Sequence, residues 1–238
     1  MIFEIIFFIF FLLIVLTIFY SISSEETTVV SSGSFNSFIG NEIIVENNDL
    51  KKYILEAQNL VSKIITEDLE IPLCIKRCQL GNGILAQAKM YNPYNVRSGG
   101  IITLNTVKLD RPERWIKIIV HEILHILGVG SSEKWQDGVE NVAGNNYLNR
   151  IIFHNSSRHY DNLIRRGKLN GTIGDAIPLS DINDSVDDGG AHLDERIFNK
   201  EIMTPIADDE NIISSLSIAL LEDLGFEVDY NINEDEFF

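Results

Sequence analysis

The stretch from Trp115 to Gly130 constrains the fold of this 238-residue chain more than any other. It contains nine apolar residues that cover almost every face of a helix: Trp115, Ile116, Ile118, Ile119, Val120, Ile123, Leu124, Ile126 and Leu127. A helix that is apolar nearly all round is buried inside its domain. His121, Glu122 and His125 belong to the same helix, so the sequence predicts three buried polar side chains. Such groups are costly to bury unless a partner satisfies them.

The two histidines of this helix are four residues apart, in the pattern H-E-x-x-H. This spacing places both imidazoles on one face, one turn apart, where both can bind one metal ion. Glu122 projects roughly 100° further round, so its carboxylate lies beside the ion rather than on it. Two histidine ligands and a glutamate on one helix are typical of zinc peptidases. The alternative is a pair of ordinary core histidines, which we disfavour because the motif rarely arises by chance and a metal with its water would satisfy these side chains.

A catalytic zinc site needs a third protein ligand and an open position for water. Gly128 is expected to end the helix, because glycine adopts a positive φ at no steric cost. In a common zinc-peptidase pattern the third ligand is a histidine six residues after the second, but that position holds Ser131, a poor zinc ligand. The third ligand must therefore come from further along the chain, where three histidines remain: His154, His159 and His192.

One of these histidines precedes an E-I-M-T-P sequence, in the segment GGAHLDERIFNKEIMTP at 189–205. Together with the H-E-x-x-H-x-x-G helix and the long insertion after it, this arrangement resembles the leishmanolysin family of the metzincin clan. The sequence GNGILAQA at 81–88 and the LLEDLGF segment within 213–228 are also similar to that family. The resemblance covers most of residues 81–230.

The resemblance implies that His192 is the third zinc ligand. It also implies that Met203 belongs to the Met-turn, a tight turn that lies under the metal. If His192 does not reach the site, His154 or a carboxylate such as Glu140 is the alternative ligand. His154 and His159 are otherwise expected on the surface or in loops. The chain departs from leishmanolysin in having only two cysteines, so no disulfide-pinned C-terminal domain is expected.

The expected fold is α+β and, by the resemblance, metzincin-like. It has a mixed twisted sheet with two long helices in an N-terminal lobe, and a loop-rich C-terminal lobe with one helix. Apolar residues recur at helical spacing over 49–66, which predicts the first long helix; the helix of the H-E-x-x-H motif is the second. Strands are expected at 42–46, 71–75, 84–90 and 101–105, and the last helix at about 214–223. The lobes are expected at about 49–130 and 131–238.

The N-terminus reads MIFEIIFFIFFLLIVLTIFY, and residues 5–20 carry no charge. The length of this run lies between that of a signal-peptide core and that of a membrane-spanning helix. We expect residues 1–23 to be a signal peptide or an N-terminal membrane anchor, 24–48 a linker, and 49–238 the metallopeptidase domain. In either case the catalytic domain is exported, and is secreted or associated with a membrane through 5–20.

Charge and cysteine content bear on partners and compartment. The formal net charge is −16 and the sequence has no basic cluster, so nucleic acid is not expected as a partner. Cys74 and Cys78 could pair in an oxidising compartment, and their spacing suits a loop or turn better than an extended strand. The oligomeric state is not predicted.

These features predict a zinc-dependent endopeptidase that hydrolyses peptide bonds of protein or peptide substrates. His121, His125 and His192 hold one Zn²⁺ whose fourth position is filled by water. Glu122 acts as the general base on that water. By the resemblance, the strand at 101–105 is the sheet edge along which an extended substrate pairs. The alternatives are a catalytically inactive zinc-containing binding or adhesion protein on a peptidase fold, and an acidic membrane-anchored structural protein with a degenerate fold of this kind.

Overall fold

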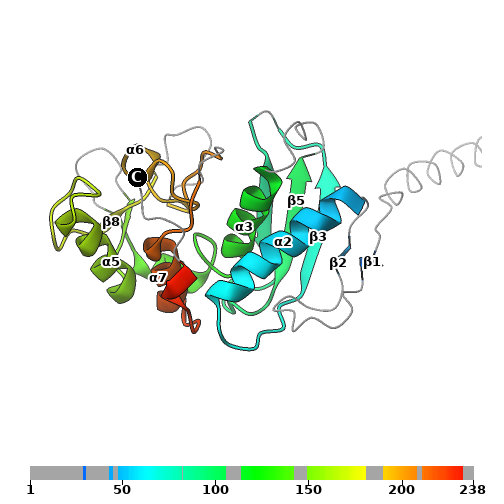
Figure 1. The fold of residues 1–238 in the computed structure, drawn as a ribbon, viewed down its shortest axis with the longest axis horizontal. Coiled ribbons are helices and arrows are strands. Elements are labelled where there is room, and N and C mark those ends of the chain that lie inside the picture. Colours follow the sequence, from blue (N-terminus) through cyan, green and yellow to red (C-terminus); the bar gives the residue numbers. More distant parts are fainter. Residues whose placement is uncertain are drawn as a thin grey trace, which may run out of the picture.

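The computed structural model describes residues 29–30, 43–44, 48–81, 83–105, 114–141, 149–180, 190–207 and 211–232. The expected signal peptide or anchor at 1–23 lies outside these residues. Figure 1 shows two parts side by side, one formed mainly by the N-terminal half of the chain and the other by the C-terminal half.

The N-terminal part is a three-stranded mixed sheet covered by two helices. Its strands are β3 (Leu73–Cys78), β4 (Ala86–Met90) and β5 (Gly100–Asn105). The strand order is β3-β5-β4, with β3 parallel and β4 antiparallel to the central β5. The helices α2 (Asn48–Ile64) and α3 (Arg114–Ile126) pack against each other, and α3 also contacts the sheet (Figure 1). The predicted mixed sheet with two long helices is confirmed.

The two helices differ in how many of their faces are buried. In α2 the buried residues Leu50, Ile54, Ala57, Val61 and Ile64 recur every three or four positions, which is one face of a helix. Most of α3 is buried, including its last five residues. Because α3 lies between α2 and the sheet, its polar motif residues are enclosed as the sequence predicts.

A short hairpin-like pair precedes α2. The strand β1 (Val29–Val30) pairs antiparallel with β2 (Ile43–Ile44). β2 falls inside the strand predicted at 42–46, and both strands lie in the segment 24–48 expected to be a linker.

The C-terminal part contains more regular structure than the sequence predicts. Its elements are α4 (Glu133–Gly138), β6 (Val139–Asn141), β7 (Asn149–Ile151), α5 (His154–Arg165), β8 (Ile177–Pro178), α6 (Glu195–Phe198), α7 (Ser215–Leu224) and the 3-10 helix η2 (Tyr230–Ile232). The strands form a small antiparallel sheet in the order β6-β7-β8. The helix predicted at 214–223 is α7, but the expectation of a single helix in this lobe is wrong.

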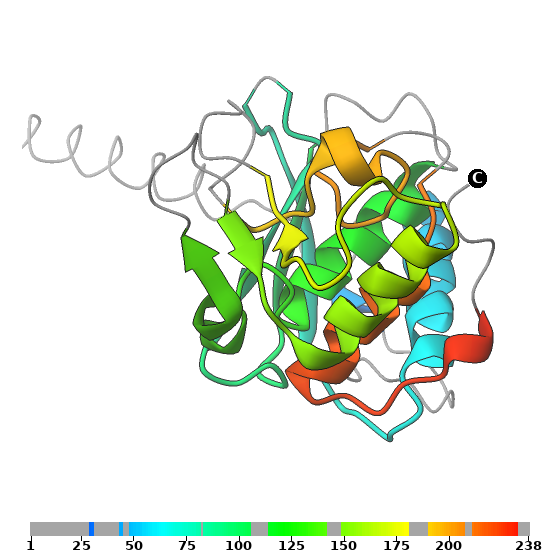
Figure 2. The ribbon, with the colours of Figure 1, turned by 90° about the vertical axis from the view of Figure 1, so that its left-hand side faces the viewer.

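The largest element missed is the twelve-residue α5, which packs beside α7 (Figure 2). α5 buries Ser156, Tyr160 and Leu163, which are spaced as one helical face. One of the three is a serine, and Ile164 is the only other apolar residue of this helix, so its apolar periodicity is too weak to stand out in the sequence.

The two parts share one hydrophobic core. α7 contributes the fully buried Leu216, Ile218 and Leu220 to a cluster that also includes Ile119 of α3 and Val61 of α2. After α7 the chain returns to the N-terminal part, where it pairs with the end of α2. There the amide of Thr66 donates to the carbonyl of Glu227 over 2.9 Å, and the amide of Asp229 to that of Ile64 over 2.8 Å.

Cys74 and Cys78 both lie on β3 and are free thiols. A strand rises about 3.3 Å per residue, so their α-carbons are roughly 13 Å apart. A disulfide requires less than about 7 Å. The fold therefore prevents the two cysteines of one chain from pairing.

Over the described stretches, no helix is both long and apolar enough to cross a membrane. The uncharged run at 5–20 lies outside those stretches.

The contact between α5 and α7 gives a first prediction. Phe153, at the N-cap of α5, makes no capping bond with its side chain. Instead both oxygens of Asp223 in α7 accept from the amides of Asn155 (2.9 Å) and Ser156 (2.8 Å). We expect Asp223→Ala to lower the free energy of unfolding by about 1 kcal/mol, the usual cost of a lost N-cap.

Urea denaturation measures this change, with Asp137→Ala as the control because Asp137 is exposed on α4. Equal stability of the two variants would contradict the capping role of Asp223.

Candidate metal centre

The end of α3 sets the position of the two motif histidines. After Ile126 the chain turns at Gly128, which has φ +104°. The amide of Gly128 donates to the carbonyl of His125 (2.9 Å), and that of Val129 to Leu124 (3.1 Å), bonds typical of a helix ended by glycine. A Cβ on Gly128 would lie only 2.7 Å from Cγ1 of Val96, so the turn also needs the small residue for space.

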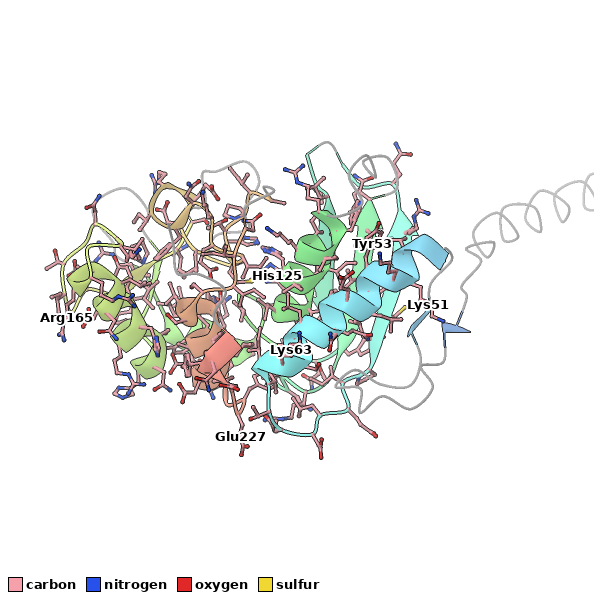
Figure 3. The ribbon with its side chains drawn as sticks, in the orientation of Figure 1. Lys51, Tyr53, Lys63, His125, Arg165 and Glu227 are labelled. Atoms are coloured by element: carbon pink, nitrogen blue, oxygen red, sulfur yellow. The ribbon has the colours of Figure 1, made fainter. Side chains whose placement is uncertain are left out.

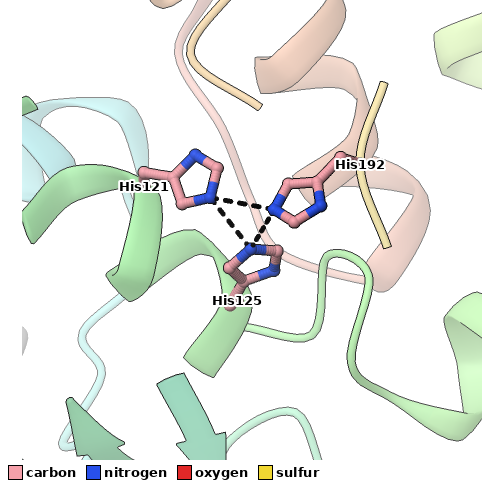
Figure 4. A group of neighbouring side chains, drawn as sticks. All are labelled: His121, His125 and His192. Atoms are coloured by element: carbon pink, nitrogen blue, oxygen red, sulfur yellow. Dashed lines mark hydrogen bonds between the residues drawn. The ribbon is translucent and has the colours of Figure 1, made fainter. Parts of the chain in front are cut away.

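The structure brings His121 and His125 together with His192, 67 residues beyond His125. The three Nε2 atoms form a nearly equilateral triangle with sides of 3.0, 3.0 and 3.1 Å (Figure 4). The centre of such a triangle lies about 1.8 Å from each corner, so one metal ion could contact all three nitrogens near the usual Zn–N distance of ~2.0–2.1 Å. The triangle lies where the two parts of the molecule meet, as the position of His125 in Figure 3 shows.

Backbone carbonyls hold the other ring nitrogens of two of these histidines. Nδ1 of His121 is 2.6 Å from the carbonyl oxygen of Ile202, and Nδ1 of His125 is 2.7 Å from that of Val129. A carbonyl only accepts, so each Nδ1 carries the ring proton and each Nε2 presents a lone pair. Lone pairs that face each other at 3.0 Å cannot bond to one another. A cation among them satisfies both, and this second contact to each ring is the usual support of a metal-bound histidine.

Burial keeps the imidazole rings of His121 and His125 neutral. Desolvation, followed by the neighbouring His192, lowers the pKa of His121 to about 3. Desolvation, followed by the other two histidines, lowers the pKa of His125 well below its ordinary value. Neutral imidazole is the form that binds metals, so the site favours ligation over protonation.

Glu122 has a carboxylate oxygen, Oε2, that is buried without a hydrogen-bond partner. Its side chain is 5% exposed. Desolvation raises the pKa of its carboxyl group to about 8. A nearby cation favours the ionised carboxylate. The histidine triangle and the unpartnered Glu122 oxygen therefore both fit a divalent metal ion at this place.

His192 reaches the triangle because its segment is held on both sides. The indole Nε1 of the fully buried Trp135 donates to the carbonyl of Gly190 over 2.9 Å. The carbonyl of His192 itself accepts from the amide of Ser180 over 2.9 Å. Gly130 packs against Ala191, the residue before His192. A Cβ on Gly130 would be only 2.1 Å from the carbonyl oxygen of Ala191.

A turn that contains Met203 completes the surroundings of the triangle. Met203 is fully buried, and the turn's Ile202 carbonyl is the group that contacts His121. The carbonyl of Met203 accepts from the amide of Leu193, the neighbour of His192, over 2.9 Å. The turn therefore contacts His121 directly and bonds to the residue that follows His192.

The other candidate ligands lie elsewhere among the described residues. His154 is exposed at the start of α5, and Glu140 is exposed on β6. His159 stacks on the ring of Tyr230 with centroids 4.6 Å apart. Ser131 lines the cleft beside the histidines, but its hydroxyl donates to the carbonyl of His125.

The histidines open into a cleft of about 840 Å³. One part of the cleft is lined by β4, through Ala86, Gln87 and Ala88. Residues 204–207, which follow Met203, also line it. The strand predicted to be the sheet edge, β5, is the central strand, because β3 and β4 flank it. The edge that faces the cleft is β4, so the prediction for 101–105 is wrong. The alternation of apolar residues in β5 does not reveal which strands pair with it.

The supports of the site that were not predicted include the carbonyls of Ile202 and Val129 and the indole of Trp135. Backbone carbonyls carry no residue signature, and nothing in the sequence relates Trp135 to a glycine 55 residues away.

The geometry fits a metal-binding site, and comparison with known families points to a metallopeptidase. A model of the peptidase family M8, described as leishmanolysin, matches residues 93–235, which is more than half of the chain. The chain therefore belongs to the leishmanolysin family of peptidases. A search of curated proteins found no match.

The close approach of Gly130 to Ala191 gives a second prediction. Gly130→Ala should displace the segment that carries His192 and weaken zinc binding by roughly tenfold or more, as is usual when the support of a ligand is lost. Gly167→Ala is the matched control: φ is +66° at Gly167 and +74° at Gly130, but a Cβ on Gly167 has nothing within 4 Å. The control should cost only backbone strain, about 1–2 kcal/mol of stability.

Zinc affinity by chelator competition and thermal unfolding are measured on both variants. Equal zinc affinities would show that the approach of Gly130 to Ala191 does not position the third histidine.

Proposed function

We propose that this chain is a zinc-dependent endopeptidase that cleaves protein or peptide substrates. The observation that carries the proposal is the triangle of three Nε2 atoms, 3.0–3.1 Å apart, with the unpartnered oxygen of Glu122 in the same cleft. Membership of the leishmanolysin family supports the same chemistry.

His121, His125 and His192 are the ligands in this proposal. Three neutral imidazoles and an open fourth position form the usual catalytic zinc site. When bound, the zinc ion activates a water molecule and polarises the scissile carbonyl. The carbonyls of Ile202 and Val129 orient the rings of His121 and His125, so that the lone pair of each Nε2 already points into the site.

Glu122 is the proposed general base. It takes a proton from the attacking water and passes it to the nitrogen of the leaving amine. Its burial makes the carboxylate a stronger base than an exposed one, because desolvation favours the protonated form. The absence of a hydrogen-bond partner at Oε2 leaves that oxygen available for the proton.

The edge strand β4 is the proposed guide for the substrate. It is the outer strand of the sheet on the side of the cleft, and its residues line that cleft. An extended peptide added beside β4 would pair through its main chain, which suits substrates of varied sequence. The turn at 204–207 lies on the same cleft and would contact side chains of the peptide.

The arrangement of the whole chain is also a proposal. Residues 1–23 direct the chain for export, as a cleaved signal peptide or a retained anchor, 24–48 link it, and 49–238 form the peptidase. Mass spectrometry of the mature N-terminus distinguishes cleavage from retention.

The role of Glu122 gives a third prediction. Glu122→Gln should retain zinc at wild-type stoichiometry and lose casein cleavage by a factor of 10² or more, on the order of a general-base contribution. Zinc analysis and a cleavage assay with and without chelator measure the two effects separately. Wild-type activity in this variant would exclude the mechanism, and a wild-type chain that binds zinc but cleaves no peptide in a broad library would favour a binding or adhesion protein.

The identity of the third ligand gives a fourth prediction. His192→Ala should remove one of three zinc ligands and leave the chain with less than one zinc ion after dialysis. His154→Ala should keep full zinc content, because His154 is exposed on α5. The reverse pattern would make His154 the ligand.

A further inference from the structure

Glu201 is a buried carboxylate that the proposed mechanism does not use. It is fully buried, directly before the turn that contains Met203. Desolvation raises the pKa of this carboxyl group, and its hydrogen bonds act in the opposite direction. A buried acidic group is expensive to keep, so its bonds should serve a purpose that an apolar residue could not.

The two oxygens of Glu201 bind two different elements. Oε2 accepts from the backbone amide of Met203 over 2.8 Å, and so bonds the turn. Oε1 accepts from the amide and hydroxyl of Ser214 (3.2 and 2.9 Å) and from the hydroxyl of Ser217 (2.6 Å). Ser214 is the N-cap of α7, so the carboxylate joins the turn to the beginning of that helix. The positive end of the helix dipole favours a carboxylate there.

The turn that Glu201 holds makes two contacts with the residues of the histidine triangle or their neighbours. The Ile202 carbonyl contacts Nδ1 of His121 over 2.6 Å, and the Met203 carbonyl accepts from the amide of Leu193, next to His192, over 2.9 Å. The amide of Ile202 also donates to the carbonyl of Ile212 over 2.8 Å. The amide of Met203 adds a bond to the Glu201 side chain, and a substitution of Glu201 can remove that bond without altering a histidine.

We propose that Glu201 is a positioning residue for the metal-binding histidines. Its Oε2 fixes the backbone of the turn, and the turn's carbonyls then hold His121 and the segment of His192 in the triangle. The inference rests on the proposed zinc site, and adds to it a carboxylate that touches neither the metal nor the substrate.

Glu201→Gln tests this directly in the full chain. Three donors face Oε1 and one faces Oε2, so a glutamine is expected to place its carbonyl oxygen at Oε1 and keep the bonds from Ser214 and Ser217. Its amide group would then face the amide of Met203, and two donors cannot bond. The bond to the turn is lost while the shape of the side chain is retained.

Ser217→Ala is the matched control, because it removes the shortest bond to the other oxygen and leaves the turn bonded. We expect Glu201→Gln to weaken zinc binding about 10- to 100-fold, the usual effect of losing such outer support. Ser217→Ala should bind zinc as the wild type does, although both variants unfold at lower temperature. Zinc affinity is measured by competition with a chromogenic chelator.

If Glu201→Gln does not fold, as judged by circular dichroism, Glu201→Asp replaces it. The shorter carboxylate remains an acceptor but cannot span both elements, so zinc binding should again be weaker than in Ser217→Ala.

The outcomes separate this inference from the proposed function. Wild-type zinc affinity in the Glu201 variants, or an equal loss in Ser217→Ala, overturns the positioning role and leaves the zinc peptidase intact. A wild-type chain that binds no zinc overturns both.

Discussion

The fold places the Nε2 lone pairs of His121 and His125 3.0 Å apart, where they cannot form a hydrogen bond with each other. Two carbonyls place the ring protons of His121 and His125 on the side away from the centre, so both Nε2 atoms face inward as acceptors. His192 brings a third nitrogen to within 3.1 Å of them from the other part of the molecule. Buried acceptors in mutual contact are unfavourable without a cation. In the proposed site the metal holds the two parts together as well as serving the chemistry, since α3 carries two of the histidines and the segment after β8 carries the third.

The shared core makes that junction rigid. α7 packs its apolar side chains with those of α2 and α3, and the chain after α7 pairs with the end of α2. Arg97 strengthens the same region: its guanidinium binds the carboxylate of Glu67 at 2.8 Å and the carbonyl of Gly225 at 2.9 Å. With its framework fixed, the cleft holds the three histidine rings together before any ion binds. Such prior ordering is what a catalytic zinc site requires, because ligands held at the right distance lose little entropy when the ion binds.

The parts of the fold that the sequence predicted are those with strong local patterns. The continuous apolar run and the H-E-x-x-H spacing predicted α3 and its two histidines, because both patterns follow from helical geometry alone. α5 was missed because one of its three buried residues is a serine, so the buried face does not appear as an apolar stripe. The edge strand was misplaced for a different reason: pairing in a sheet is set by contacts between distant segments, and the residues of one strand do not show which strands lie beside it.

The site shows the same division. His192 was reached through a family resemblance rather than through spacing, because 67 residues separate it from His125 and no local rule spans them. Glu201 was visible only as part of the E-I-M-T-P sequence, and its partners Ser214 and Ser217 lie on a helix beyond the turn. Groups that act through backbone atoms, such as the carbonyl of Ile202, have no sequence signal at all. These supports become evident only when the folded chain places them beside the rings.

In the proposed site, one metal ion is held by three imidazoles from both parts of the chain. X-ray absorption at the zinc edge of the purified, zinc-loaded protein tests it most directly, because the spectrum reports the type and number of nearest atoms. We expect a first shell of nitrogen and oxygen at about 2.0–2.1 Å with the outer-shell scattering of three imidazole rings. A sulfur shell near 2.3 Å, or the scattering of fewer than three imidazoles, would contradict it.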